Sequence, residues 1–236
     1  MAKENYVLLI GAVQESPMVN EEKGKGRVVI QTLRRNDKID LPVISALDDT
    51  LVQKLKTLTA GEYILVKGIL ATNEVKKGVI CPNCNEKTKS QGTTTEIIAI
   101  EIIPIGSQYE LNQLKEVSNN VMLLGSLCRD PEFRLLSNTG VPSAQYQIAV
   151  NRKYTVKKQQ SSYSDYPWVN SFGKQAEQDA IRLQTGSQVF INGGLQTRNI
   201  QKNMECEHCS TSFKAEDHVA EIVPYSVEYL NNCKFE

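Results

Sequence analysis

The sequence predicts a mainly β protein made of two tandem copies of one five-stranded barrel, and three observations predict it. Residues 61–70 align with residues 186–195 at an offset of 125 positions. The same offset places one C-x-x-C motif on another. Each half also shows three strands, one short helix and two more strands. Five strands with a helix between the third and fourth is the order of an OB barrel, and a duplicated domain is the simplest account of the repeat.

The first copy is expected over residues 1–105. Asp48 and Asp49 are suitable N-cap residues for its helix, and Gly61 ends that helix. No aromatic residue lies within 27–45, so we interpret this copy as a degenerate and mainly structural barrel that adds weak electrostatic contacts. Its strands are expected near residues 6–11, 27–34, 39–45, 62–70 and 95–105, with the helix at about 48–59.

The second copy is expected over residues 119–236, after a linker at 106–118 in which Leu111, Leu114 and Val117 have helical spacing. Each barrel carries its C-x-x-C hairpin between strands four and five. The strands of this copy are expected near residues 120–127, 143–152, 166–172, 187–198 and 219–230, with the helix at about 174–184.

Composition and charge indicate an ordinary globular protein. Of the 236 residues, 40% are hydrophobic and 23% are charged. The 27 basic and 27 acidic residues cancel, so no global field attracts polyanions, although a local basic groove is enough to bind one. The first apolar run, Tyr6 to Ile10, is too short for a signal-peptide core or a membrane span. We therefore expect a cytoplasmic protein.

Catalytic motifs are missing from the sequence. It shows no glycine-rich phosphate loop, no nucleophile elbow and no clustered acid–base pair. The two histidines, His208 and His218, both lie near the second C-x-x-C motif. We therefore predict that the protein is not an enzyme, and an enzyme with a zinc-ribbon accessory domain ranks last among the alternatives.

Two matched C-x-x-C motifs predict a metal site. Each motif supplies two thiolate ligands from one tight turn, whereas a structural zinc site needs four. The economical solution is one four-cysteine zinc site that bridges the two hairpins and fixes the barrels relative to each other. Its ligands are Cys81, Cys84, Cys206 and Cys209.

Other arrangements of these cysteines stay open at this point. His218 and Asp217 could complete a site within the second copy alone, or the two motifs could meet across a dimer interface. A redox C-x-x-C is disfavoured because no thioredoxin-like βαβ pattern surrounds either motif. Free thiols are the remaining alternative. Cys128 and Cys233 stand alone and are interpreted as ordinary thiols.

Aromatic and basic residues gather in the second copy. Tyr166, Trp168 and Phe172 have even spacing on one predicted strand and therefore share a face. Tyr154 lies at the end of the preceding strand. Non-specific binding of a nucleic-acid single strand requires flat apolar faces for the bases and cations along the phosphates. The basic neighbours of Tyr154 are Arg152, Lys153, Lys157 and Lys158.

The alternative for these aromatics is the barrel core, where alternating aromatics on a strand usually lie. Val169 and Ser171 already fill the inward positions of this strand, and the loop at 159–165 is polar. Both features favour a binding face for Trp168 and Tyr154 and leave Phe172 between the two interpretations.

Segments of the second copy resemble the bacterial single-stranded DNA-binding proteins. They comprise Asn120–Leu127 with Asp130–Arg134, then Ile148–Arg152, Phe172–Glu177, and Gly186–Val189 through Leu195–Arg198. They occur in the family's order and cover most of residues 119–230. The first copy lacks the Asp-Pro-Glu and Phe-Gly-Lys elements and joins the family only through the internal repeat.

The resemblance implies OB barrels that bind single-stranded DNA in replication or recombination. It places Tyr154, Tyr166 and Phe172 at base-stacking positions and puts Ile200 at a fourth, where one platform is lost. Trp168 takes a position where the family often has a basic residue. Candidate phosphate contacts beyond the basic cluster are Arg129, Arg134, Lys174 and Arg198.

The resemblance also bears on partners. Single-barrel family members assemble as tetramers, so a two-barrel chain would reach four barrels as a homodimer. The family's usual acidic tail ending in Phe, which recruits replication and repair proteins, is missing, which leaves a plasmid, phage or mobile-element variant possible. The main rival is an OB scaffold that binds protein within a replication or mobile-element complex, favoured by the neutral net charge and the weakened first copy.

Overall fold

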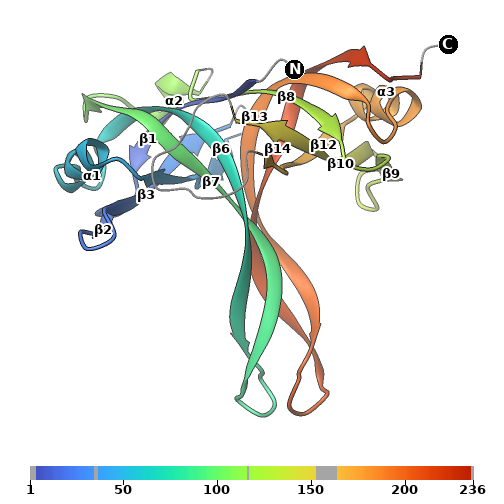
Figure 1. The fold of residues 1–236 in the computed structure, drawn as a ribbon, viewed down its shortest axis with the longest axis horizontal. Coiled ribbons are helices and arrows are strands. Elements are labelled where there is room, and N and C mark those ends of the chain that lie inside the picture. Colours follow the sequence, from blue (N-terminus) through green and yellow to red (C-terminus); the bar gives the residue numbers. More distant parts are fainter. Residues whose placement is uncertain (1–3, 35–36, 116, 153–163, 235–236) are drawn as a thin grey trace.

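A computed structural model describes residues 4–34, 37–115, 117–152 and 164–234. It contains two barrels and two long β-ribbon arms that run side by side away from them (Figure 1). The first barrel and its arm comprise β1 (Glu4–Val13), β2 (Met18–Asn20), β3 (Lys25–Leu33), β4 (Ile39–Asp40), β5 (Val43–Ala46), α1 (Asp49–Lys56), β6 (Tyr63–Ile80) and β7 (Lys87–Gly106). The second comprise β8 (Asn119–Leu127), β9 (Glu132–Leu135), β10 (Pro142–Asn151), β11 (Ser164–Asp165), β12 (Trp168–Phe172), α3 (Lys174–Arg182), β13 (Gln188–Glu205) and β14 (Ser212–Asn231).

The two barrels have the same pairing scheme. In the first, β1 pairs antiparallel with β3 and β6, and β5 closes the barrel by parallel pairing of Ile44 with Ile97 on β7. In the second, β8 pairs with β10 and β13, and Val169 on β12 pairs with Ile222 on β14. Inward-facing Val, Leu and Ile side chains fill one continuous apolar cluster across both barrels. The tandem OB fold predicted from the repeat is confirmed.

One short helix plugs each barrel. Asp48 caps α1 by accepting a hydrogen bond from the Thr50 N–H at 3.0 Å, and Leu51, Val52 and Leu55 are buried beneath it. In α3, Ala176 is buried in the same way. Among the described residues, no helix is both long and apolar enough to cross a lipid bilayer.

The linker between the barrels packs against the first one. It forms a single helical turn, α2 (Leu111–Leu114), as the spacing of its apolar residues predicts. Leu114 is buried in a small cluster with Ala12 and Tyr63. The linker therefore extends the core of the first barrel.

The barrels join through their first strands. β1 pairs antiparallel with β8, and Val7 lies opposite Val121. These two residues are equivalent in the repeat, so the pairing runs about a local twofold axis between the copies. The first strands thereby cover each other's open edge and make the sheet continuous from one barrel to the other.

The arms are longer than the sequence predicted. The strands expected at 62–70 and 95–105 extend to Ile80 and start at Lys87, and their partners in the second copy are lengthened in the same way. The arm segments alternate polar with small or β-branched residues and lack a buried core. An isolated two-stranded ribbon is only marginally stable. Each arm is supported by the other, for example through the ion pair between Lys77 and Asp217.

Proline interrupts the third predicted strand of each barrel. The strand expected at 39–45 is split into β4 and β5 at Pro42. The strand expected at 166–172 starts only after Pro167, as β12, and the short strand β11 precedes it. Proline has no N–H to donate to a ladder. Tyr166 therefore precedes β12 and is not one of its residues.

Candidate nucleic-acid interface and metal centre

The four cysteines of the two C-x-x-C motifs meet at the tips of the arms. The Sγ atoms of Cys81 and Cys209 lie 3.7 Å apart, and those of Cys84 and Cys206 lie 3.6 Å apart. All four sulfur atoms are within 4.8 Å of one another. A tetrahedral zinc–sulfur distance of about 2.3 Å separates the sulfurs by about 3.8 Å. The cluster can therefore hold a metal ion of this kind.

The turns that carry the cysteines have the same backbone in both arms. The Asn85 N–H donates to the Cys81 carbonyl and the Ser210 N–H to the Cys206 carbonyl, each at 3.0 Å. Asn85 and Ser210 both adopt positive φ, at 59° and 53°. The repeat has thus preserved a tight turn that presents two sulfur atoms from each tip.

Polar neighbours favour the thiolate form of two cysteines. Hydrogen bonding with the Thr211 side chain and backbone, and then with Asn83, lowers the pKa of the Cys209 thiol to about 6. A hydrogen bond from Thr88, on the opposite arm, lowers the pKa of Cys206. Thiolates are the form that binds metal.

The alternative ligands named from the sequence lie elsewhere. Asp217 pairs with Lys77, and His218 Nδ1 lies 2.9 Å from the Asn199 side-chain oxygen. The four-cysteine cluster is formed within one chain, without a second copy. Cys128 is exposed and Cys233 is half-buried, apart from the cluster.

The aromatic residues predicted to share a face lie on β12 and just before it. Trp168 and Phe172 lie on β12, opposite Gln147 and Ser143 of β10, whereas Val169 between them is fully buried. Tyr166 is 45% exposed and Phe172 is 36% exposed. Large apolar side chains with this exposure offer surfaces for base stacking.

A cation covers the tryptophan of this face. The Arg129 guanidinium carbon lies 4.4 Å from the centre of the Trp168 ring, and an Arg129 nitrogen is 3.8 Å from Glu132. Arg129, one of the candidate phosphate contacts, thus interacts with the π face of the tryptophan. Arg134 and Lys174 are exposed beside the same face, at the end of β9 and the start of α3.

Two polar residues near the face have internal partners. Asn170 is 5% exposed and bonds the Ser143 hydroxyl at 2.9 Å. Arg198 donates to the buried carboxylate of Glu221 at 2.9 and 3.1 Å, while its side chain stays 44% exposed. Arg198 therefore remains near the surface with part of its hydrogen-bonding capacity already used.

Arg152 is buried with an acidic partner. Its side chain is 7% exposed and forms two hydrogen bonds with Asp165, which is fully buried. The sequence alone predicted Arg152 as part of the basic cluster, because its partner carboxylate is 13 positions away along the chain and no local pattern links the two. The other residues of that cluster, Lys153, Tyr154, Lys157 and Lys158, lie outside the described residues.

Ile200 lies on the second arm, on β13. It is half-buried and sits opposite Asp217, whose carboxylate reaches Lys77 on the other arm. The position interpreted as a lost stacking platform thus lies where the two arms meet.

The first barrel has a groove where the second has its aromatic face. The groove has a volume of about 480 Å³. In register, the pair Arg27 and Ser45 of the first barrel corresponds to Gln145 and Asn170 of the second. Sequence reasoning noted the basic run around Arg27 but did not place it in a groove. The lining includes Met18, Asn20, Lys25, Arg27, Ser45, Leu47, Asn73 and Glu96.

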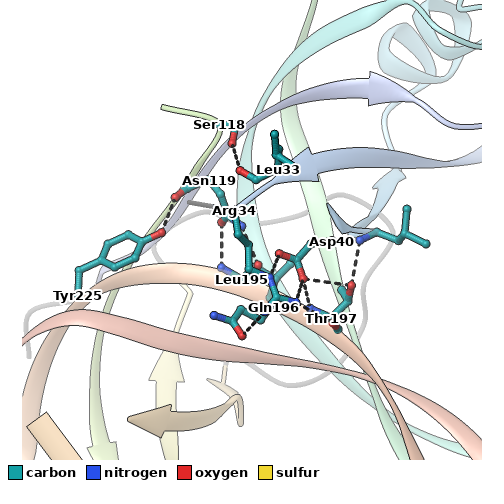
Figure 2. A network of polar contacts seen from close by, with 10 residues as sticks. Leu33, Arg34, Asp40, Ser118, Asn119, Leu195, Gln196, Thr197 and Tyr225 are labelled. Atoms are coloured by element: carbon teal, nitrogen blue, oxygen red, sulfur yellow. Dashed lines mark hydrogen bonds and ion pairs between the residues drawn. The ribbon is translucent and has the colours of Figure 1, made fainter. Parts of the chain in front are cut away.

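A buried polar network ties the first barrel to the second (Figure 2). Arg34 donates to Asp40 at 2.6 and 2.8 Å, and a carboxylate oxygen of Asp40 accepts the Thr197 N–H at 2.6 Å. The Leu41 N–H donates to the Thr197 hydroxyl oxygen at 2.9 Å. Arg34 also reaches Gln196 at 2.8 Å. This arginine, which looks like a surface charge in the sequence, thus has a role in joining the domains.

Comparisons with known proteins agree with this architecture. Residues 118–221 match the Single-strand binding protein family. The chain is 30% identical over 116 residues to single-stranded DNA-binding protein 2 of Clostridium acetobutylicum, covering 48% of this chain and 76% of that protein. It is 36% identical over 112 residues to single-stranded DNA-binding protein 1 of Staphylococcus aureus, covering 48% and 65%.

Solved structures extend the likeness to both barrels. The wild-type single-stranded DNA-binding protein from Thermus aquaticus matches with a TM-score of 0.69 and 16% identity, covering 100% of this chain and 97% of that one. A deletion mutant of the same protein matches with a TM-score of 0.67 and 17% identity, covering 99% and 97%. At this identity the likeness concerns the fold.

Proposed function

The chain belongs to the single-strand binding protein family, and from this premise we propose that it binds single-stranded DNA, chiefly through the second barrel. Its role is binding and not catalysis, as for the family. The observation that carries the proposal is the aromatic face of the second barrel: Tyr166 and Phe172 are exposed, and Trp168 lies half-buried on the same strand as Phe172. Each stacked base contributes about 1–3 kcal/mol.

Cations around the aromatic face supply the phosphate contacts. Arg134 and Lys174 are exposed, and Arg129 is held over the tryptophan ring. A base that stacks on Trp168 displaces the guanidinium toward the phosphates. Arg152 is left out of the interface because its side chain is committed to Asp165.

The first barrel contributes electrostatic contacts from its groove. Lys25 and Arg27 are exposed there, and among the described residues neither forms an ion pair. The groove carries no aromatic side chain. It therefore contacts the phosphates of a strand without stacking its bases.

The four cysteines bind one structural zinc ion in this proposal. Their spacing suits a tetrahedral site, and four protein thiolates leave no open position for chemistry. The ion would fix the two arm tips to each other. Elemental analysis of the purified chain should give about one zinc per chain, and a metal-free chain with reduced thiols would contradict the proposal.

A second copy of the chain would cover the outer face of the joined sheet. Two such chains, each with two barrels, would form a homodimer with four barrels. A monomeric mass in solution would contradict it.

Titration with oligo-thymidine tests the main proposal. Trp168 is the only tryptophan of the chain, so its emission reports on the aromatic face. Single strands should quench it, less so as salt rises, whereas a duplex of equal length should not. Flat emission together with no complex in a gel-shift assay would contradict DNA binding and favour the protein-scaffold alternative.

A further inference from the structure

Tyr166 of the second barrel is held by a residue of the first. Its backbone N–H donates to the Thr72 hydroxyl oxygen at 2.8 Å. Thr72 lies on β6, and its own N–H donates to the carboxylate of Asp165 at 2.9 Å. Two consecutive residues of the second barrel therefore form hydrogen bonds with one threonine of the first. We call these contacts of Thr72 with Asp165 and Tyr166 the Thr72 latch.

The Thr72 latch has a rigid base. Asp165 is fully buried and receives two hydrogen bonds from Arg152, at 2.6 and 2.7 Å. It lies on β11, which pairs with only two residues of β10, Val150 and Asn151. The charge-assisted bonds are the strong contacts of this short strand. They fix the position of Asp165, the residue directly before Tyr166.

The backbone of Tyr166 depends on side-chain contacts, because it lies between two strands. Asp165 ends β11, Pro167 has no N–H, and β12 starts at Trp168. The Tyr166 carbonyl accepts a hydrogen bond from the Gln147 side chain at 2.9 Å. Among the described residues, the amide has Thr72 as its partner. The first barrel thus holds the N–H of Tyr166, and the second barrel holds its carbonyl oxygen.

The same latch occurs in the opposite direction, from the second barrel to the first. There Thr197 donates its N–H to Asp40 and accepts the N–H of Leu41 (Figure 2). Thr197 and Leu41 are equivalent to Thr72 and Tyr166 at the repeat offset. We call this the Thr197 latch. It holds a half-buried leucine, where the Thr72 latch holds an exposed aromatic.

We infer that Thr72 is a positioning residue for the DNA-binding face of the second barrel. This inference rests on the proposed function. By fixing the peptide of Tyr166, the threonine holds its ring in place before DNA arrives and so lowers the ordering cost of stacking. The aromatic face is therefore completed by the first barrel, although that barrel carries no stacking aromatic of its own.

Threonine-to-valine substitutions separate positioning from general support. Thr72→Val removes only the hydroxyl and keeps both the shape and the N–H bond to Asp165. Thr197→Val makes the same change in the Thr197 latch and is the matched control. Binding of labelled oligo-thymidine is measured by fluorescence anisotropy for both variants, in the unaltered chain and in a Tyr166→Ala background, with thermal unfolding alongside.

Thr72→Val should weaken binding about threefold to tenfold. The dissociation constant of Thr197→Val should stay within about twofold of that of the unaltered chain. The two valine variants should unfold at similar temperatures. In the Tyr166→Ala background the Thr72→Val effect should fall to about twofold or less, because the ring it positions is gone. Thr72→Ser, which keeps a hydroxyl, should bind like the unaltered chain.

Several results would overturn the inference. They are equal losses from the two valine variants, an undiminished loss in the Tyr166→Ala background, and no effect of Thr72→Val or of Tyr166→Ala. If the unaltered chain fails to bind oligo-thymidine, the proposed function fails with it. That result is distinguishable from a chain that binds DNA normally and is insensitive to Thr72.

Discussion

The two barrels share their pairing scheme, plugging helix, latch and metal turn, and differ on the face that meets solvent. At the position of Phe172, which is 36% exposed, the first barrel has Leu47, which is 7% exposed. At the position of Trp168 it has Val43. The two copies thus share a framework, while one carries exposed aromatic side chains and the other a polar groove. The backbone framework can therefore be kept while the side chains on its exposed face change.

Loss of the aromatic face should have the largest effect on binding. The double variant Tyr166→Ala and Phe172→Ala removes two platforms, each worth about 1–3 kcal/mol, so the affinity for oligo-thymidine should fall by about 2–6 kcal/mol. Fluorescence anisotropy with a labelled strand measures it. Leu41→Ala, at the position equivalent to Tyr166, is the control. Its affinity for oligo-thymidine should stay within about twofold of that of the unaltered chain. Equal losses from both would remove the distinction between the barrels.

The two latches should differ in stability. Asp165→Asn removes the buried negative charge that pairs with Arg152 and should lower the free energy of unfolding by about 3–5 kcal/mol. Asp40→Asn should cost less, because the Arg34 side chain is 19% exposed, against 7% for Arg152. Chemical denaturation of both variants gives the comparison. A larger cost for Asp40→Asn would contradict the assigned roles.

Loss of one cysteine ligand should have the same effect on zinc binding in either copy. Cys81→Ser and Cys206→Ser remove one ligand from opposite arms, and both should reduce bound zinc from about one per chain to near zero. Loss of the ion should lower stability by about 3 kcal/mol where free zinc exceeds its dissociation constant a hundredfold. Elemental analysis and thermal unfolding measure this, with Cys128→Ser as control. Retention of zinc by either variant would contradict the shared site.

The groove of the first barrel should give the smallest effect and a different signature. Lys25→Ala with Arg27→Ala should weaken binding modestly and reduce the salt dependence, by about 0.7 in the logarithmic slope for each phosphate that the variant no longer neutralises. The aromatic double variant should leave that slope nearly unchanged. Titrations at several salt concentrations test the difference. An unchanged slope in the groove variant would make the first barrel purely structural.

Much of the barrel architecture can be predicted from the sequence because apolar runs and a repeat identify it. The helix at Asp48 follows from its cap, and the meeting of the four cysteines follows from their equivalent positions. The ends of the arm strands could not be predicted in this way. Beyond Leu70 the strands bury little, so the apolar pattern ends before the ladder does.

The partners of charged residues were also beyond sequence reasoning. Arg152 and Arg198 look like surface cations until Asp165 and Glu221 are brought beside them by folding. The threonine latches link residues more than 90 positions apart. Such contacts depend on how one barrel sits on the other, which no local pattern encodes.

The pairing of β1 with β8 also sets how the protein responds to dilution. Two separate chains would form such a sheet to an extent that depends on their concentration. Here residues 107–118 tether the two edges, and a short tether gives an effective concentration on the order of millimolar. The barrels therefore stay joined at any dilution in which the chain remains folded, with the latches and the cysteine cluster already assembled.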